Sequence, residues 1–309
     1  MGVSTAFYLH GLSLPGGVFF SELTDLTPTI NHDRLIGMAS GHPEPLFAGL
    51  NSQAFDISFS TPAVKKFLDP IIASGNTPYG VGVSGNIDLY YIASQDLDAR
   101  QAGASAVHYR FRATKGLLWW KTIRGSQGQS ASIEGTLTLL WDGTNPPLVP
   151  AGSVVLAGTP VASQFYTMGP VGLSNVSIGG LQDWSLASGC NVAPLIGDGD
   201  FWGGYCGIRS AAPVLTGRCI GNPGKDIAIL GAALTDLDMY LLAKVANAGT
   251  LAKGTAGHIC LHAGAGHLTF DSIRSGVNEP SSTSFQATIV ATNSSTAALS
   301  MDTAIACGI

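Results

Sequence analysis

The sequence predicts a mainly β protein made of two tandem domains, residues 1–150 and 151–309, each a β-sandwich or barrel with a flanking short helix and a long hairpin or loop. Three observations lead to this prediction. The chain repeats itself at an offset of 150 residues, apolar residues alternate with polar ones in several short runs, and Gly, Asn and Pro clusters separate those runs. The length of 309 residues suits two domains of ordinary size.

The repeat aligns residues 88–143 with residues 238–293 without a gap. Of these 56 positions 13 are identical, where roughly three to five identities are expected by chance from ordinary residue usage. The identical residues of the first copy are Asp88, Tyr90, Ala93, Ala102, Ala106, His108, Ala113, Gly116, Leu118, Ile123, Arg124, Ser132 and Thr138. A repeated domain usually supplies geometry, such as pseudo-symmetry in an assembly. A structural protein is therefore the first hypothesis and an enzyme the second.

The front parts of the two copies match only at shifted offsets. Ala6-Phe7-Tyr8 at the start of the chain is echoed by Gln164-Phe165-Tyr166, and Gly16-Gly17 is aligned with Gly179-Gly180. The stiff, turn-forming segment 146–159 is the expected boundary between the copies.

Alternating and aromatic-rich runs predict the strands of both copies. The predicted strands are Asn51–Ser60, Ile87–Ile92, Val107–Arg112, Ala131–Trp141, Leu237–Leu242 and Phe285–Ala291. One helix is predicted over Ser60–Asp69, because Ser60 or Thr61 can cap it, Pro62 suits its first turn, and Pro70 would end it. A second short helix is expected near residues 243–253.

The composition predicts a chain whose surface is largely covered by neighbouring subunits. Only 11% of residues are charged, 45% are hydrophobic and the mean hydropathy is +0.28, and interface cores are depleted in charge. The net charge is −5 and is spread over both halves without a basic block, which argues against nucleic-acid binding through phosphate neutralisation. We expect no signal peptide and no membrane-spanning segment.

The candidate chemical motifs are each weak, so we predict no catalytic residues, no cofactor and no metal. Gly197-Asp198-Gly199-Asp200 lacks the further ligands of a calcium loop, and a solvated turn is the default interpretation. His258 and His262 lie about 13 Å apart if they share a strand, too far for one zinc ion, although His267 could fold back across a hairpin. Gly221–Lys225 fails the phosphate-loop pattern.

The five cysteines all lie in the second half, at positions 190, 206, 219, 260 and 307. None forms a CxxC pair, and the odd count argues against a disulfide framework. We expect them to be small buried residues.

Trp119 and Trp120, with Lys121 and Arg124, form the densest aromatic and basic cluster of the chain. One interpretation is a strand buried on both faces. The other is a long hairpin whose aromatic and arginine side chains dock on a neighbouring subunit. The candidate inter-subunit contacts are Trp119, Trp120, Ile123 and Arg124, with Ile273 and Arg274 of the second copy.

With these repeated segments the chain resembles the major tail proteins of bacteriophages, the subunits of the tail tube. The resemblance covers residues 85–145 and 235–300, where a strand, a short polar or helical stretch, a long hairpin and a Thr-containing strand follow one another. The phrases 165–171 and 179–181 loosely resemble openings of such domains.

The resemblance implies subunits that close into rings and rings that stack into a tube. Because this chain carries two such domains where most members carry one, the implied ring is a homotrimer with pseudo-sixfold symmetry. The implied partners are further copies of the chain and other tail proteins, with genomic DNA passing through the lumen without sequence-specific binding. The implied location is the virion tail, and the host cytoplasm during assembly. A virion head or decoration protein, and a hydrolase with an unrecognised site, remain the alternatives.

Overall fold

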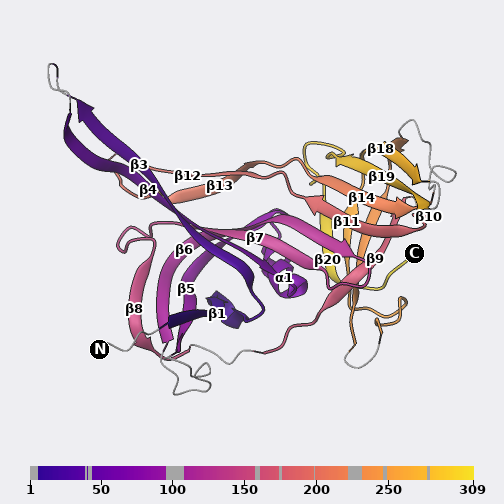
Figure 1. Cartoon of the computed structure of the whole chain (residues 1–309), viewed down its shortest axis with the longest axis horizontal. Coiled ribbons are helices and arrows are strands. Elements are labelled where there is room, and N and C mark those ends of the chain that lie inside the picture. Colours follow the sequence, from indigo (N-terminus) through magenta and orange to yellow (C-terminus); the bar gives the residue numbers. More distant parts are fainter. Residues whose placement is uncertain are drawn as a thin grey trace.

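The computed structural model describes residues 6–38, 40, 44–94, 108–156, 161–173, 176–197, 199–221, 232–245, 249–276 and 279–309. Antiparallel strands dominate the described part (Figure 1). The strands of the first half are β1 (Ala6–Leu14), β2 (Val18–Phe20), β3 (Thr24–Met38), β4 (Pro45–Thr61), β5 (Gly80–Ser94), β6 (His108–Ser126), β7 (Ser132–Leu139) and β8 (Val149–Val154). A single 3-10 turn, η1 (Pro15–Gly17), and one helix, α1 (Val64–Ser74), accompany them.

The second half begins after β8 and contains strands alone among its described residues. Its strands are β9 (Tyr166–Leu173), β10 (Val176–Ser177), β11 (Leu181–Ala187), β12 (Asn191–Leu195), β13 (Tyr205–Ser210), β14 (Val214–Ile220), β15 (Ala232–Leu234), β16 (Leu237–Ala243), β17 (His258–Ala263), β18 (Gly266–Gly276), β19 (Glu279–Ile289) and β20 (Ser300–Ile305).

One 13-stranded sheet runs through both halves, with the path β15-β18-β19-β14-β11-β6-β5-β1-β2 and with β3, β4, β7 and β8 beside it. It curves into a half-barrel. A 5-stranded sheet, β10-β9-β16-β17-β20, packs against its second-half part, and β12 and β13 form a separate hairpin. The prediction of a mainly β fold is confirmed, but the two halves share a sheet where two separate sandwiches were expected.

The shared sheet results from the length of β6. This strand has 19 residues, so its first part pairs with β5 and its last part, Thr122–Ser126, extends beyond β5. There β11 of the second half pairs with it. The strand β8 also pairs with β6, so the sheet of the first half continues to Val154, past the expected end at residue 150.

Four predicted strands lie within longer observed ones wherever the structure describes them: Asn51–Ser60, Ile87–Ile92, Val107–Arg112 and Leu237–Leu242. The other two were predicted too long, because Ala131–Trp141 extends past both ends of β7 and Phe285–Ala291 extends past the end of β19. Asn51–Ser60 is the inner part of β4, which continues outward into a long hairpin with β3. The alternation stops being informative there, because both faces of the hairpin are exposed.

The helix begins and ends later than predicted. Val64, Phe67, Leu68 and Ile71 of α1 face the core, and Gly75 ends the helix in the left-handed conformation. Pro70 lies inside the helix, so the expectation that it ends the helix is wrong. Burial of four apolar side chains outweighs the one backbone hydrogen bond that a proline removes.

The second predicted helix, near residues 243–253, is also wrong for the residues described there. Ala243 ends β16, and residues 249–253 are irregular. The described part of the second half therefore has no flanking helix, in contrast to the prediction of one in each domain.

Candidate assembly interface

The two halves pair their strands in the same register. Five successive pairs join β5 to β6, from Ile87–Ala113 to Tyr91–Tyr109, and the five pairs joining β16 to β17 are the same positions plus 150. Eight pairs join β6 to β7, from Gly116–Leu139 to Arg124–Ser132, and all eight recur between β18 and β19 at plus 150. The register shift after Trp120 recurs after Phe270. A shared bulge is informative because bulges are specific local features of a strand pair.

The first strands of the two halves, β1 and β9, also correspond. Their offset differs from the one given by the similarity of residues 6–8 to residues 164–166. Phe7 pairs with Ala93 on β5, and Tyr166 pairs with Ala243 on β16, so Phe7 matches Tyr166 at an offset of 159. The predicted match of Tyr8 with Tyr166 is therefore off by one residue. Gly179-Gly180 lies in the turn between β10 and β11, and its alignment with Gly16-Gly17, which lies between β1 and β2, is wrong.

By their pairing, β3 corresponds to β11 and β4 to β14. Ile57 of β4 pairs with Leu137, and Leu215 of β14 pairs with Ala287, which is the counterpart of Leu137. The offset here is 158 residues. Pro28, which pairs with Ile57, is therefore the counterpart of Leu186, which pairs with Leu215.

An internal junction joins the two halves edge to edge. The register pairs Thr122 with Ala187, Ile123 with Leu186 and Arg124 with Ser185. The backbone of the junction is completed on both sides, where Ser188 N–H donates to Lys121 at 2.8 Å and Gln127 N–H donates to Gln182 at 2.8 Å. We call this set of contacts the internal junction.

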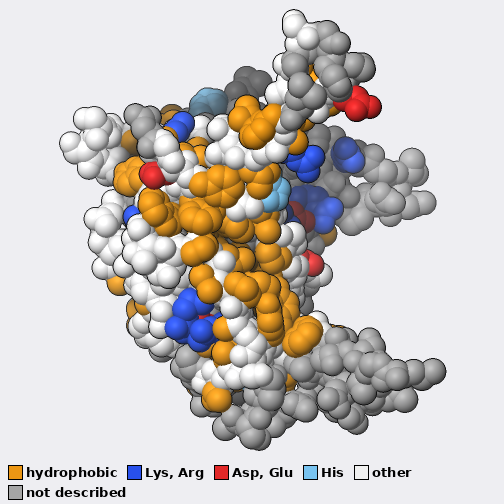
Figure 2. Space-filling view, turned by 90° about the vertical axis from the view of Figure 1, so that its left-hand side faces the viewer, with side chains coloured by type: hydrophobic (Ala, Val, Ile, Leu, Met, Phe, Trp, Pro, Cys, Tyr) orange, Lys and Arg blue, Asp and Glu red, His pale blue; other side chains and the backbone are white. Residues whose placement is uncertain are grey.

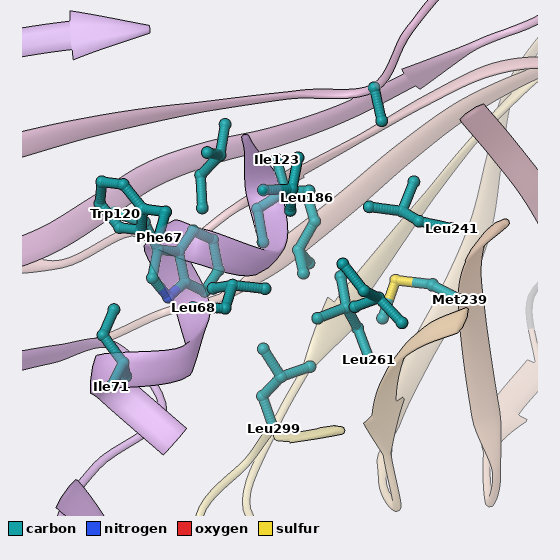
Figure 3. Packing of buried hydrophobic residues seen from close by; sticks show 14 of the residues in the cluster. Phe67, Leu68, Ile71, Trp120, Ile123, Leu186, Met239, Leu241, Leu261 and Leu299 are labelled. Carbon is teal, nitrogen blue, oxygen red and sulfur yellow. The ribbon is translucent and has the colours of Figure 1, made fainter. Parts of the chain in front are cut away.

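The start of β9 and the helix α1 extend the internal junction. The N–H of Ala131 donates to the carbonyl of Tyr166 at 2.8 Å, and the Thr303 hydroxyl on β20 donates to Asp69 on α1 at 2.7 Å. Figure 3 shows Leu68 and Ile71 of α1 in one cluster with Met239, Leu241 and Leu261 of the second half. The face of β16 and β17 is thus covered by the first half.

The residues predicted to contact other subunits divide into two groups. Trp120 and Ile123 are fully buried, and the Trp120 indole donates to the carbonyl of Pro78 at 2.8 Å, so both belong to the core of the chain. Trp119 is half-buried and has Lys121 over its ring at 5.6 Å. Arg124 is exposed, 3.6 Å from Glu134.

Ile273 and Arg274 are exposed on β18, beyond the three residues that pair with β15. No described strand pairs with that edge of β18 after Leu268, and none pairs with the outer edge of β3. Among the described residues, the long sheet therefore has one open edge along β18 after Leu268, in the second half, and another along β3, in the first half.

The hairpin of β3 and β4 extends far from the body of the molecule (Figure 1). We call the described residues of its outer part, 27–38 and 45–50, the arm. Its exposed large hydrophobic side chains are Ile30, Leu35, Ile36, Met38, Phe47 and Leu50. Exposed apolar residues concentrated on one hairpin are typical of a protein contact site.

The counterpart of the arm in the second half, the β12–β13 hairpin with the turn between its strands, is docked. It lies across the first half, where the carbonyl of Phe201 accepts from Gln53 N–H at 3.0 Å and that of Gly203 accepts from Trp141 N–H at 2.9 Å. Trp202 adds a ring contact with Trp141, 6.4 Å between centroids. One hairpin thus has a partner within the chain, and the equivalent arm has none among the described residues.

The first copy holds a buried ion pair, and equivalent positions of the second copy hold a partly exposed aspartate–histidine contact; the sequence did not predict either. Asp88 is buried and accepts two hydrogen bonds from Arg112, at 2.6 and 2.7 Å, which raise the pKa of that guanidinium. At plus 150, Asp238 lies 2.9 Å from His262, and Asp236 lies 3.3 Å from the same ring. The identity of Asp88 and Asp238 was the available signal.

The three side chains Asp236, Asp238 and His262 are close enough to hold a metal ion together, although exposed acidic groups often gather without one. His258 and His267 do not belong to this group. His258 is buried, where its ring accepts from Ala243 N–H at 3.1 Å and contacts the carbonyl of Ala252 at 3.1 Å. His267 pairs with Ala233 and Thr288 in the long sheet.

All five cysteines are free thiols, and three are buried. Burial raises the pKa of Cys219 to about 11 and that of Cys260 to about 12. We expect both to react slowly with a maleimide at pH 7, because the thiolate is the reactive form. Mass spectrometry of the labelled protein should find them unmodified in the folded chain and modified in denaturant. Fast labelling of either residue in the folded chain would contradict the burial described here.

Within the described residues, α1 is too short to cross a membrane, and no other helix qualifies. Comparison with known proteins finds no family model that matches the chain and no matching curated protein.

Proposed function

We propose that this chain is a structural subunit of a bacteriophage tail tube, which polymerises into stacked rings and forms the conduit for DNA delivery. The observation that carries the proposal is the internal junction between two halves with the same strand register. One chain already holds two consecutive units of a repeating arrangement, and the sheet edge at each end is open.

Open sheet edges favour further pairing. An unpaired strand presents a row of backbone donors and acceptors, and proteins that do not use such an edge usually block or cover it. Repeating the internal junction between chains would satisfy the edges of β18 and β3 together. Closure of the series into a ring would leave neither of these two edges open, as in a closed barrel.

The implied stoichiometry follows from two units per chain. A ring of six units requires three chains, so we propose a homotrimeric ring with pseudo-sixfold symmetry, stacked with other rings and joined to other tail proteins. The net charge of −5 suits a lumen through which DNA slides without binding. The proposed location is the tail of the virion, with assembly in the host cytoplasm, and no enzymatic activity is proposed.

Negative-stain electron microscopy of the purified full chain tests the proposal. We expect rings with six lobes from three chains, or tubes of stacked rings. Closed shells or knobs would favour the alternative of a head or decoration protein. Monodisperse monomers over the whole accessible concentration range would contradict self-assembly.

The arm gives a sharper variant of this experiment. Replacing Ile36 and Phe47 by Ser removes two exposed apolar side chains, each more than half exposed, and should leave the fold intact. We expect fewer or shorter assemblies at equal concentration, counted on micrographs, because arm contacts would be lost. The control variant replaces Val290, which is also exposed but lies on the body, by Ser. Equal assembly by both variants would remove the arm from the proposal.

A further inference from the structure

We infer that successive copies of this chain join through the edge of β18 and the edge of β3, in the register of the internal junction. The inference rests on the proposed function, and it adds which surfaces meet and which residues stand opposite each other. The partner is a second copy of the same chain.

The end of β18 lacks the cover that its counterpart has. Ile123 and Ile273 are the same residue at equivalent positions of the repeat, paired with Ile133 and Thr283 in the same register. Ile123 is 0% exposed because β11 and the second half lie against it, whereas Ile273 is 52% exposed. The cover missing at Ile273 is at the position that the second half takes beside Ile123.

The opposite end of the chain lacks the complementary cover. Tyr166, which the internal junction holds through Ala131, is 1% exposed, whereas its counterpart Phe7 is 52% exposed. Phe7 lies on the first half and Ile273 on the second. Ile273 of one chain and Phe7 of the next would therefore lie on the two sides of the same junction.

A broader apolar face surrounds Phe7. The rings of Phe7, Tyr109, Phe111 and Tyr91 form a contact series with centroids 5.1–6.0 Å apart on β1, β5 and β6. Three of these rings are half-buried, whereas Leu241, Ile259 and Leu261, the counterparts of Tyr91, Tyr109 and Phe111, are fully buried. Figure 2 shows a continuous band of hydrophobic side chains on this end of the molecule. An apolar band of this kind fits the second half of another copy.

The internal junction fixes the register between chains. Thr27, Pro28 and Thr29 of β3 are the counterparts of Ser185, Leu186 and Ala187, because they pair with equivalent residues of the next strand. Arg274, Ile273 and Ser272 are the counterparts of Arg124, Ile123 and Thr122. Transferring the observed pairs places Thr27 opposite Arg274, Pro28 opposite Ile273 and Thr29 opposite Ser272 of the neighbouring chain.

Pro28 is consistent with an edge strand that pairs selectively. In the internal junction the hydrogen-bonded pairs include Ser188–Lys121 and Gln182–Gln127, so by alternation Leu186 also directs its backbone groups at β6. Pro28 at the equivalent place has no N–H, and a proline on an edge strand limits unspecific pairing. One backbone hydrogen bond would remain at this pair, in which Ile273 N–H of one chain donates to the Pro28 carbonyl of the next.

Engineered disulfides test the register in the full chain. Thr27–Arg274 and Thr29–Ser272 correspond to pairs that exchange no backbone hydrogen bonds, whose Cα atoms lie about 4.5 Å apart, within the range a disulfide spans. The variants are T29C with S272C and T27C with R274C, oxidised after assembly and run on a non-reducing gel. The matched control is N31C with S272C, whose cysteines would be diagonal neighbours roughly 7–8 Å apart.

We expect loss of the monomer band and a ladder ending at one closed species for the two in-register variants, with the number of rungs giving the ring size. Mixing the T29C and S272C single variants should stop at dimers. The control variant should cross-link no more than wild type.

Assemblies that form without in-register cross-links, or that cross-link through N31C instead, would overturn this inference and leave the proposed function standing. A chain that neither assembles nor cross-links would overturn both.

Discussion

Replacing Ile123 by Ala should lower the free energy of unfolding by about 3 kcal/mol, whereas replacing Ile273 by Ala should lower it by less than about 0.5 kcal/mol. The two residues are equivalent in sequence and in strand register. Ile123 is surrounded by the core, so its truncation leaves a cavity. Ile273 is half exposed, so its truncation costs the single chain little.

For assembly we expect the opposite order, with Ile273→Ala having the larger effect and Ile123→Ala the smaller one. Ile273→Ala should raise the protein concentration needed for ring formation at least about tenfold, because an apolar residue at the centre of an interface is worth more than 1 kcal/mol. Urea unfolding at a concentration where the chain is monomeric measures the first quantity, and sedimentation measures the second. Equal destabilisation by both variants would show that Ile273 is covered within the chain, and unchanged assembly of Ile273→Ala would exclude it from the interface.

Replacing Asp88 by Asn should lower the free energy of unfolding by about 3 kcal/mol. This is a larger loss than we expect for the same substitution at Asp238, the equivalent position of the second copy. The Asp88 side chain is 2% exposed and lies 2.6 Å from Arg112 and 3.7 Å from Arg110. Loss of its charge would leave two arginines, both largely buried, without the carboxylate that compensates them. Removing one partner of a buried pair is expensive for this reason.

The matched variant is Asp238→Asn at the equivalent position of the second copy. Its partner His262 is half exposed, and Asp236 lies within 3.3 Å of the same ring, so we expect a cost below about 1 kcal/mol. Urea unfolding of the monomeric chain, monitored by tryptophan fluorescence, compares the two. A cost at Asp238 as large as that at Asp88 would mean that exposure does not govern the strength of these pairs.

The sequence predicted six strands, which correspond to β4, β5, β6, β7, β16 and β19 among the 20 strands of the described residues. Alternation and β-branched or aromatic residues marked the inner part of β4, β7 and β16. The last five residues of both β7 and β16 are buried on both faces, so composition rather than alternation marks those parts. The offset of 150 residues also aligned strands whose pairing, including the bulge after Trp120, the structure then showed to recur. Pairing register follows residue by residue from such a repeat because a strand has a period of two.

The helix boundaries and the arm could not be predicted in this way. Pro70 remains inside α1 because Phe67, Leu68 and Ile71 pack against strands from both halves, a contribution that local propensity does not contain. The arm carries exposed apolar residues on a paired hairpin, so its sequence resembles that of a buried strand.

The sequence by itself determined that this protein is mainly β, that its second half repeats part of its first, and that Ile123 and Ile273, or Asp88 and Asp238, occupy equivalent positions. Only the tertiary structure decided which member of each pair is buried. Burial depends on what lies against a residue, and here the first and second halves cover each other at one junction while the equivalent surfaces at the two ends remain open.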